Sequence, residues 1–415
     1  RHGDDWIFLT LLGIIMALLS FVMDILIERF HIARIWLYNM SSPNVYLQYF
    51  SWMIAPLILV LFSTGFTRIV SPQAIGSGIP EIKTIMRGVS MNEYLTFNTL
   101  LAKVIGLSTA VGSGLPIGKE GPFVHVASIS AFLLAKLFPT FKLDFKNSTC
   151  NTEILAAACA VGVACTFAAP IGGVLFSIEV TASYFAVRNY WRGFYSAVCG
   201  AIVFRLLAIW FDDESTLTAL FQTNLRQDVP FDPMEIVSFS IVGLALCGIG
   251  GSLLICAHKN LSLFISKKLE IANFIKDYCL VYPFFATFVM MSLLFPPGSG
   301  MFMVGLLTNN DAVNELFSNV TWLTRDADTY EEDRLLKLWR GPFNNVFLTL
   351  FIFIVTRFWM CVVSTSLPVP SGIFMPSFTL GAACGRLIGE ILAWLFPNGI
   401  GGDMVVPGGY AIVGA

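Results

Sequence analysis

Long stretches without a charged residue recur along the chain. Six of them are long enough to cross a hydrocarbon core of ~30 Å as a helix: 6–23, 45–67, 154–178, 236–257, 279–310 and 358–385. Shorter ones cover 95–118, which Lys103 interrupts, 121–135, 193–204 and 341–356. Apolar side chains would occupy every face of these stretches, whereas transmembrane strands alternate apolar and polar residues. The pattern therefore predicts membrane-crossing helices.

The composition agrees with a chain embedded in a lipid bilayer. Of its 415 residues, 56% are hydrophobic and 13% are charged, against about 25% charged in soluble domains. A soluble globule or enzyme needs a more polar exterior than this. The net charge of −2 gives no reason to expect nucleic acid as a partner. We predict an all-α, multi-pass membrane protein whose first apolar stretch is not a cleaved signal.

Cysteine and histidine are not arranged to hold a metal. Eight of the nine cysteines lie inside apolar stretches, and no two of them form a Cys-x-x-Cys pair. The four histidines are scattered without the spacing of ligands. We therefore predict no metal site and no cofactor.

Charge in the polar segments predicts an orientation. The segments 136–146 and 258–276 are basic, which places them in the cytoplasm by the positive-inside tendency. The segment 309–340 is acidic and contains Asn319-Val320-Thr321, an acceptor sequence for N-glycosylation. One apolar stretch separates it from the second basic segment, so we expect it outside, with Asn319 as the glycosylation candidate.

The number of crossings requires one apolar stretch to enter and leave the membrane on the same side. Three such stretches lie between the two basic segments: 154–178, 193–211 and 236–257. Three full crossings would place the second basic segment outside. The best candidate for the return is 154–178, because Pro170, Gly172 and Gly173 interrupt it. A helix broken at membrane depth needs protein or water to satisfy its freed backbone groups.

Three short motifs occur twice in the same order. The pairs are 76–78 with 298–300, 118–122 with 372–376, and 161–162 with 413–414. The interval between the first two motifs is 32 residues longer in the second half than in the first. This difference is nearly the length of the acidic segment 309–340, so we interpret that segment as an insertion in the second half. We predict two repeat halves, 1–221 and 222–415. Because the second half stops sooner after its last motif, we expect the sequence to be part of a longer chain.

Repeats with Gly- and Pro-broken apolar segments predict a transport site near the membrane midplane. In 76–80, 118–122 and 372–376 a glycine is followed by proline and an apolar stretch, which suits the first turn of a helix. Helix N-termini carry free N–H groups and partial positive charge, so several together would bind an anion. No arginine cluster lies near these motifs, which disfavours phosphate.

Two charged residues and one serine stand out at these helix starts. Lys119 and Glu120 lie between long uncharged stretches, where an ionisable residue is a candidate for function. Lys119 could pair with Glu120 or extend towards the membrane surface. Ser77 suits a helix cap, and its hydroxyl could also face an anion.

The motifs Gly76-Ser77-Gly78-Ile79-Pro80, Gly118-Lys119-Glu120-Gly121-Pro122 and Gly372-Ile373-Phe374-Met375-Pro376 resemble the signature segments of the CLC chloride channels and transporters. The stretches 168–180 and 185–193 resemble the animal plasma-membrane channel branch. The resemblance implies inverted repeat halves, with broken half-helices that meet near the midplane. It also implies a plasma-membrane homodimer with one chloride pore per subunit. The pore tyrosine and the nucleotide-binding CBS domains of the family would lie beyond Ala415, and nothing identifies an accessory subunit.

The resemblance also assigns roles to residues. It implies that the Ser77 hydroxyl and the backbone amides of Ile373 and Phe374 bind the central chloride. Glu120 becomes a gate whose carboxylate competes with chloride for an outer site. The implied chloride-binding set is Ser77, Gly118, Lys119, Glu120, Gly121, Ile373 and Phe374.

Single residues distinguish three candidate functions. Proton-coupled exchangers of the family resemble one another in a second acidic residue at the position of Val180, and valine cannot relay a proton. A gated, passive chloride channel is therefore favoured over an exchanger, although Glu179 lies next to this position. We expect Glu179 to be structural, either at a helix end or in a salt bridge with a nearby arginine such as Arg188 or Arg192. An enzyme using Glu120 and His125 is disfavoured, because five residues is a poor spacing on a helix face.

Overall fold

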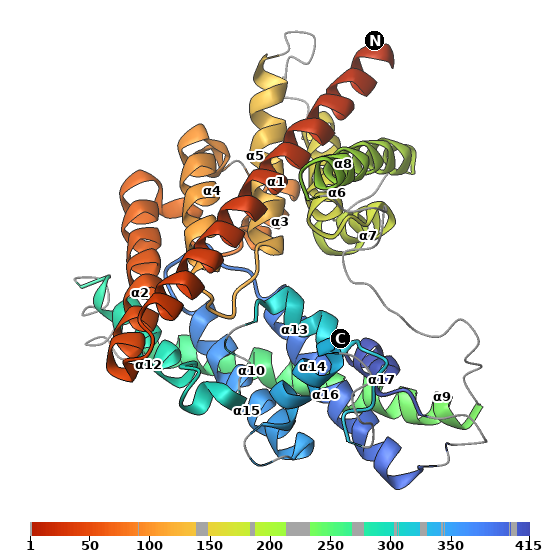
Figure 1. The fold of residues 1–415 in the computed structure, drawn as a ribbon. Coiled ribbons are helices and arrows are strands. Elements are labelled where there is room, and N and C mark those ends of the chain that lie inside the picture. Colours follow the sequence, from red (N-terminus) through yellow and green to blue (C-terminus); the bar gives the residue numbers. More distant parts are fainter. Residues whose placement is uncertain are drawn as a thin grey trace.

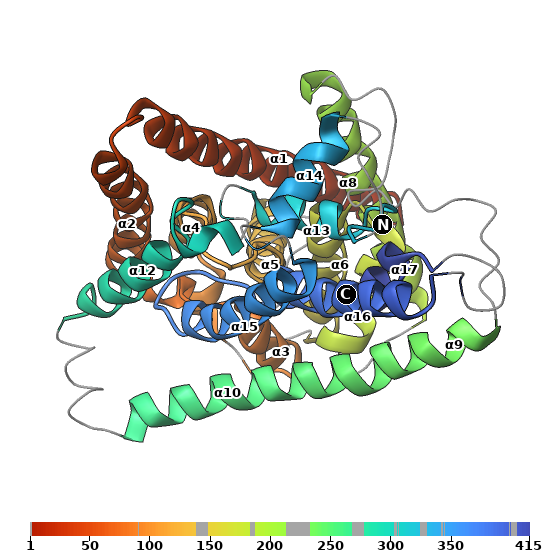
Figure 2. The same ribbon diagram turned by 60° about the horizontal axis from the view of Figure 1, so that its bottom comes forward.

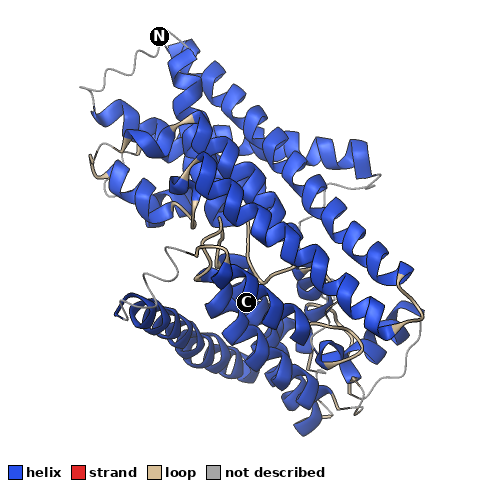
Figure 3. Ribbon diagram, turned by 90° about the vertical axis from the view of Figure 1, so that its left-hand side faces the viewer, coloured by secondary structure: helices blue, strands red, loops and turns tan. Residues whose placement is uncertain are grey.

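The computed structural model describes residues 2–89, 91–137, 148–182, 187–212, 233–267, 278–302, 305, 307–323, 330–341, 343, 345–397, 399 and 405–415. All regular elements in these ranges are helical, as Figure 3 shows. The expectation of an all-α chain is confirmed.

The first half of the chain forms one group of helices, which fills the upper part of Figure 1. Its α-helices are α1 (His2–Met40), α2 (Val45–Val70), α3 (Ile79–Met86), α4 (Phe97–Gly112), α5 (Glu120–Leu137), α6 (Ser148–Phe167), α7 (Pro170–Phe176) and α8 (Arg188–Asp212). Short 3-10 turns, η1 (Pro72–Ala74) and η2 (Asn92–Leu95), flank α3, and a π-helical turn, η4 (Ser177–Thr181), follows α7.

The second half contributes a further group of helices, which fills most of the lower part of Figure 1. They are α9 (Pro233–Ser240), α10 (Gly248–Lys267), α12 (Val281–Leu293), α13 (Asn309–Leu316), α14 (Tyr330–Arg340), α15 (Val346–Thr365), α16 (Phe374–Leu395) and α17 (Pro407–Gly414). A π-helical segment, η5 (Ile241–Cys247), joins α9 to α10 in one long rod along an edge of the molecule (Figure 2). A 3-10 turn, η6 (Ser299–Phe302), follows α12. The predicted boundary at 221/222 lies outside the described residues.

Six helical segments of the described chain are long and apolar enough to cross a membrane. They are Asp5–Met40, Val45–Val70, Asn189–Phe211, Val237–Lys267, Val346–Thr365 and Phe374–Leu395. Two predicted stretches are wrong as single spans. The stretch 358–385 is divided between α15 and α16, because Pro368 and Pro370 cannot continue a helix there. In its described residues the stretch 279–310 contributes α12, the turn η6 and the first two residues of α13, since Pro296 and Pro297 prevent α12 from continuing.

The chain reverses direction between α6 and α7, as the crossing count required. Ala168 takes a left-handed conformation with φ of 51° directly after α6. Gly173 of α7 then lies against Ala160 and Ala164 of α6, so closely that a Cβ on Gly173 would collide with the Ala160 carbonyl oxygen. The two helices therefore form a tight hairpin. This confirms that 154–178 is not one continuous crossing.

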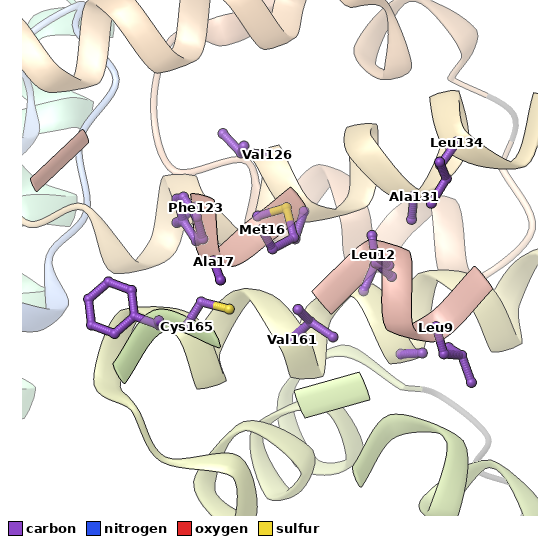
Figure 4. Close-up of a cluster of buried hydrophobic side chains, with 14 of the residues drawn as sticks. Leu9, Leu12, Met16, Ala17, Phe123, Val126, Ala131, Leu134, Val161 and Cys165 are labelled. Atoms are coloured by element: carbon purple, nitrogen blue, oxygen red, sulfur yellow. The ribbon is translucent and has the colours of Figure 1, made fainter. Parts of the chain in front are cut away.

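A close-packed core joins α1 to α5 and α6. Leu12, Met16 and Ala17 of α1 meet Phe123 of α5 and Val161 of α6, all of them buried (Figure 4). Burial of this kind fixes the first turns of α5, where two of the predicted site residues lie.

The two halves repeat the same packing in the same register. Gly162 of α6 lies against Ala127 of α5, with 3.0 Å from an ideal Cβ to the Ala127 Cβ. Gly414 of α17 lies against Gly381 of α16. Ala127 and Gly381 each stand five residues after the proline of their motif. The repeat predicted from short motifs is therefore a repeat of helix packing.

Candidate functional site

The three signature segments meet at one place. Gly118 and Gly372 form the one isolated bridge of the described chain, in which each N–H donates to the other's carbonyl oxygen at 2.8 and 2.9 Å. The Gly76 N–H donates to the Val369 carbonyl oxygen at 3.2 Å. Gly121 lies against the Ser77 side chain, with 3.2 Å from an ideal Cβ to the Ser77 Cβ. Segments from both halves of the chain thus surround a common point.

Each signature segment ends in a helix start, as predicted. α3 begins at Ile79, α5 at Glu120 and α16 at Phe374. The N–H groups in the first turn of each helix have no carbonyl partner within the helix and carry partial positive charge. The site is therefore surrounded by backbone donors and contains no arginine of the described chain.

Glycine is required where α3 approaches α5. Gly78 has φ of 80°, a left-handed conformation, and a Cβ there would collide with the His125 ring. A larger residue would push the start of α3 away from α5. The position of Ser77, one residue earlier, depends on this close approach.

The Glu120 carboxyl is buried over the bridge. Glu120 is 7% exposed, and its Oε2 has no hydrogen-bond partner. The carboxyl folds back so far that a Cβ on Gly118 would collide with Oε2. The backbone amides of Met375 and of Glu120 itself interact with the carboxyl group. The carboxyl group thus occupies the space between the first turns of α5 and α16.

Lys119 pairs with an acidic residue that the sequence did not suggest. Its Nζ forms an ion pair with Asp24 Oδ1 in the middle of α1. The partner of Lys119 is therefore Asp24 rather than Glu120, the partner considered from the sequence. The side chains of Lys119 and Asp24 are 14% and 35% exposed, so the pair is partly buried. The available signal was an aspartate directly after an apolar stretch within a long helix.

Ser77, Ile373 and Phe374 lie at the open side of the site. Ser77 is half-buried, and its Oγ lies 3.4 Å from the Ile79 nitrogen. The side chains of Ile373 and Phe374 are 40% and 45% exposed although they are apolar. The Phe374 ring meets the Phe167 ring edge-on at 4.9 Å. The α6–α7 turn therefore also borders the site.

A buried lysine lies behind the start of α3. Lys103 is fully buried, and its Nζ lies 2.9 Å from His125 Nδ1. His125 Nε2 lies 3.0 Å from the Tyr94 carbonyl oxygen, so Nε2 donates and Nδ1 accepts from Lys103. His125 is thus engaged away from Glu120, and the Glu120–His125 acid–base pair is not formed. The interruption of an apolar stretch by Lys103 was the signal for this cluster.

Val180, the position that the resemblance links to proton coupling, lies in the turn η4. Val180 is half-buried and Glu179 is exposed. Arg192 binds Asp5 at 3.0 Å and Glu153 at 2.9 Å, so the expected Glu179–Arg192 pair is wrong. The acids of α1 and α6 lie nearer to this face of α8 than the turn does. The side chain of Arg188 lies outside the described residues.

The glycosylation candidate lies in a segment held by α16. Asn319 is half-buried, and its Oδ1 is enclosed without a hydrogen-bond partner. Arg386 of α16 donates to the carbonyl oxygens of Leu316 and Ser318 at 3.0 and 2.6 Å. Glycosylation of Asn319 stays a prediction.

A family model described as "Voltage gated chloride channel" matches residues 57–415. The chain belongs to this family. It is 51% identical to proteins named chloride channel protein 2 from Drosophila melanogaster and Homo sapiens. It is 49% identical to chloride channel protein 1 of Rattus norvegicus. All three matches cover 100% of this chain but only 35%, 47% and 42% of the relatives. The chain thus spans less than half the length of these relatives.

Solved structures confirm the inverted-repeat CLC fold. A structure titled as a eukaryotic CLC transporter has a TM-score of 0.73 at 30% identity and covers 99% of this chain and 63% of its own. A slow cyanobacterial Cl⁻/H⁺ antiporter also has a TM-score of 0.73, at 18% identity, over 99% of this chain and 84% of its own. The second likeness concerns the fold alone.

Proposed function

We propose that this protein is a gated chloride channel that conducts chloride passively, with Glu120 as its gate. The observation that carries the proposal is the Gly118–Gly372 bridge, which sets the starts of α5 and α16 around the Glu120 carboxyl. The relatives named chloride channel protein 1 and 2 support it.

The site would stabilise chloride through partial charges. The Ser77 hydroxyl and the first-turn amides at Ile373 and Phe374 would donate to the central ion. Fixed cations would bind it more tightly, and a conducted ion must also leave. Gly118, Lys119 and Gly121 would line the outer part, where the Lys119 charge is balanced by Asp24.

The Glu120 carboxylate would compete with chloride for the outer position. The ionised group is attracted to the same amides that would bind an anion, including that of Met375. Protonation removes this charge and frees the side chain to leave the position. External acid and external chloride would therefore both favour opening.

A chloride/proton exchanger is the alternative within the family, since two proteins of similar fold are proton-coupled antiporters. An exchanger must carry protons across apolar protein to Glu120, which needs a titratable group on the way. Val180 cannot serve, and the exposed Glu179 points elsewhere, because neighbouring residues in a helical turn face different directions. The residues therefore support passive conduction.

We also propose a homodimer in the plasma membrane with one pore per subunit. The hairpin of α6 and α7 leaves a short helix and a π-helical turn, with Ile171 and Leu175 63% and 51% exposed. Irregular backbone at membrane depth needs protein or water around it rather than lipid. A second subunit would supply that cover.

The test is a reversal potential measured with purified protein in a planar bilayer. Under a chloride gradient the reversal potential should follow chloride alone and stay unchanged when a pH gradient is added. A shift with the pH gradient would show a fixed chloride-to-proton ratio and support the exchanger. Absence of anion current or flux would contradict both.

A further inference from the structure

The segment that leads from α4 to Glu120 lies outside the helices, so individual hydrogen bonds must hold it in place. We call residues 113–118 the gate linker, because Gly118 forms the bridge to Gly372 and Glu120 begins α5. Five of its six residues are buried, and a buried carbonyl oxygen without a donor costs free energy. The donors that its carbonyl oxygens find therefore decide how firmly the start of α5 is held.

The middle of the gate linker is held by a serine of the second half. Ser364 of α15 is fully buried, and its Oγ lies 3.0 Å from the Pro116 carbonyl oxygen and 3.1 Å from the Cys361 carbonyl oxygen of its own helix. The Cys361 carbonyl oxygen has a second side-chain donor in Thr365 Oγ1, at 2.9 Å. Ser364 is the donor that the described chain brings to Pro116. Because the hydroxyl has one proton to donate, we assign it to the Pro116 carbonyl oxygen.

A tight turn presents this carbonyl oxygen to α15. The Ile117 N–H donates to the Leu115 carbonyl oxygen at 2.8 Å, and Pro116 is the middle residue of the turn. Proline has no N–H, so its carbonyl oxygen is the one backbone group through which it can be held. The second half contains the same turn, in which the Val369 N–H donates to the Leu367 carbonyl oxygen at 2.8 Å. The turn is thus a feature of the repeat, and in the first half it attaches the linker to α15.

The two ends of the gate linker are held by α1. Arg34 is 3% exposed, and its Nη1 donates to the Ser113 carbonyl oxygen at 2.9 Å. Gly114 has φ of 83°, and a Cβ there would collide with Arg34 Nη1. Lys119, directly after the linker, pairs with Asp24 of the same helix. With both ends fixed to α1, the turn between them is the part whose position depends on the α15 serine.

We propose that Ser364 is a positioning residue for the Glu120 gate, an inference that rests on the gating role proposed for Glu120. The Ser364 hydroxyl holds the turn at Pro116, two residues before the glycine bridge over which the Glu120 carboxyl folds. The closed gate requires this folded-back carboxyl, whereas the open gate does not. Loss of the hydroxyl therefore destabilises the closed state more than the open state.

Ser364→Ala should make the gate easier to open. With the full chain in a planar bilayer, half-maximal opening should need about threefold less external chloride and should occur at higher external pH. The pH shift is upward because the ionised carboxyl is bound less tightly in the closed position, so a lower proton concentration releases it. Ser364→Cys keeps a weak donor and should shift both values less. It supplies the same test if Ser364→Ala does not assemble.

Ser63→Ala is the matched control. Ser63 is also fully buried, and its Oγ donates to the Gly106 carbonyl oxygen at 2.7 Å between α2 and α4. Both alanine variants should lose thermal stability in detergent, since each loses a buried hydrogen bond, but Ser63→Ala should gate as wild type does. Equal shifts of opening in the two variants would show a general loosening and would overturn the inference.

The Glu120→Gln background separates this inference from the proposed function. With no charged gate to position, Ser364→Ala should leave opening and conductance unchanged in Glu120→Gln, and a further change there overturns the positioning role. If Glu120→Gln is ungated while Ser364→Ala alone gates as wild type does, the inference is wrong and the gating proposal stands. If Glu120→Gln itself gates normally, the gating proposal is wrong, and the inference that rests on it is wrong as well.

Discussion

Gly118 and Gly372 exchange two backbone hydrogen bonds across the junction of the two halves, at 2.8 and 2.9 Å. An ideal Cβ on Gly372 would lie 3.0 Å from both the Gly118 carbonyl oxygen and Pro122 Cδ. The starts of α5 and α16 are thus joined by main chain, and side chains are excluded from the contact.

Gly372→Ala should therefore destabilise the junction. The added methyl group must push the two segments apart, which costs about 1–3 kcal/mol in a well-packed interior. Thermal unfolding in detergent measures the loss, and halide flux should change with it. Gly65→Ala is the matched control, because no atom lies within 4 Å of its ideal Cβ. It should be neutral or slightly stabilising. Equal effects of the two substitutions would contradict the close contact.

Replacement of Glu120 by glutamine should keep the pore open. Gln is of nearly the same size but has no charge to compete with chloride. We expect currents with little dependence on voltage or external pH, while wild type opens as external pH falls. Glu153→Gln, at an acid paired with Arg192, is the control and should gate normally. Normal gating in Glu120→Gln would rule out the assigned role.

Ser77→Ala tests the donor at the central ion. A hydrogen bond to a charged group contributes about 1.5–3 kcal/mol, so conductance or the order of Cl⁻, Br⁻ and NO₃⁻ permeability should change about tenfold or more. Ser108→Ala removes a hydroxyl that bonds only within α4, to the Val104 carbonyl oxygen at 2.8 Å, and should leave permeation unchanged. Identical selectivity in Ser77→Ala and wild type would count against the assignment.

The Lys119–Asp24 pair should affect how easily Glu120 leaves the outer anion position. Asp24→Asn leaves the Lys119 charge unbalanced, which stabilises the ionised Glu120 carboxylate, so half-maximal opening at a fixed external chloride concentration should shift to lower external pH. Lys119→Met should shift it the opposite way. The double variant tests coupling, because the two shifts should not add if the residues act as a pair. Simple additivity would contradict the ion pair.

Val180→Glu should not create proton coupling. A single acid at η4 supplies one titratable group, whereas transfer to Glu120 needs a complete path. The reversal potential should still follow chloride in a pH gradient. A pH-dependent reversal potential in this variant would show that the remaining path already exists.

The sequence predicted the features that depend on neighbouring residues, namely where helices begin and where the chain reverses. Proline after glycine marked the starts of α3, α5 and α16, and the crossing count placed the reversal near Pro170. The partners of charged side chains were harder to predict, because they come from distant parts of the chain. Asp24 lies 95 residues from Lys119, and His125 joins Lys103 across a gap of 22 residues. Arg192 likewise pairs with Asp5 of α1 and Glu153 of α6 rather than with the nearby Glu179, because the fold brings these distant acids next to it.

The reciprocal Gly118–Gly372 bridge has the form of a contact across a two-fold axis, in which one position meets its own counterpart. A gene duplication would explain it, since two identical half-length chains inserted in opposite directions could have made the same bridge. In such an ancestor the residue two positions after the glycine would have been the same on both sides. Today it is Glu120 on one side and Phe374 on the other. Fusion of the halves thus allowed one acidic group to be kept where symmetry would have imposed two or none.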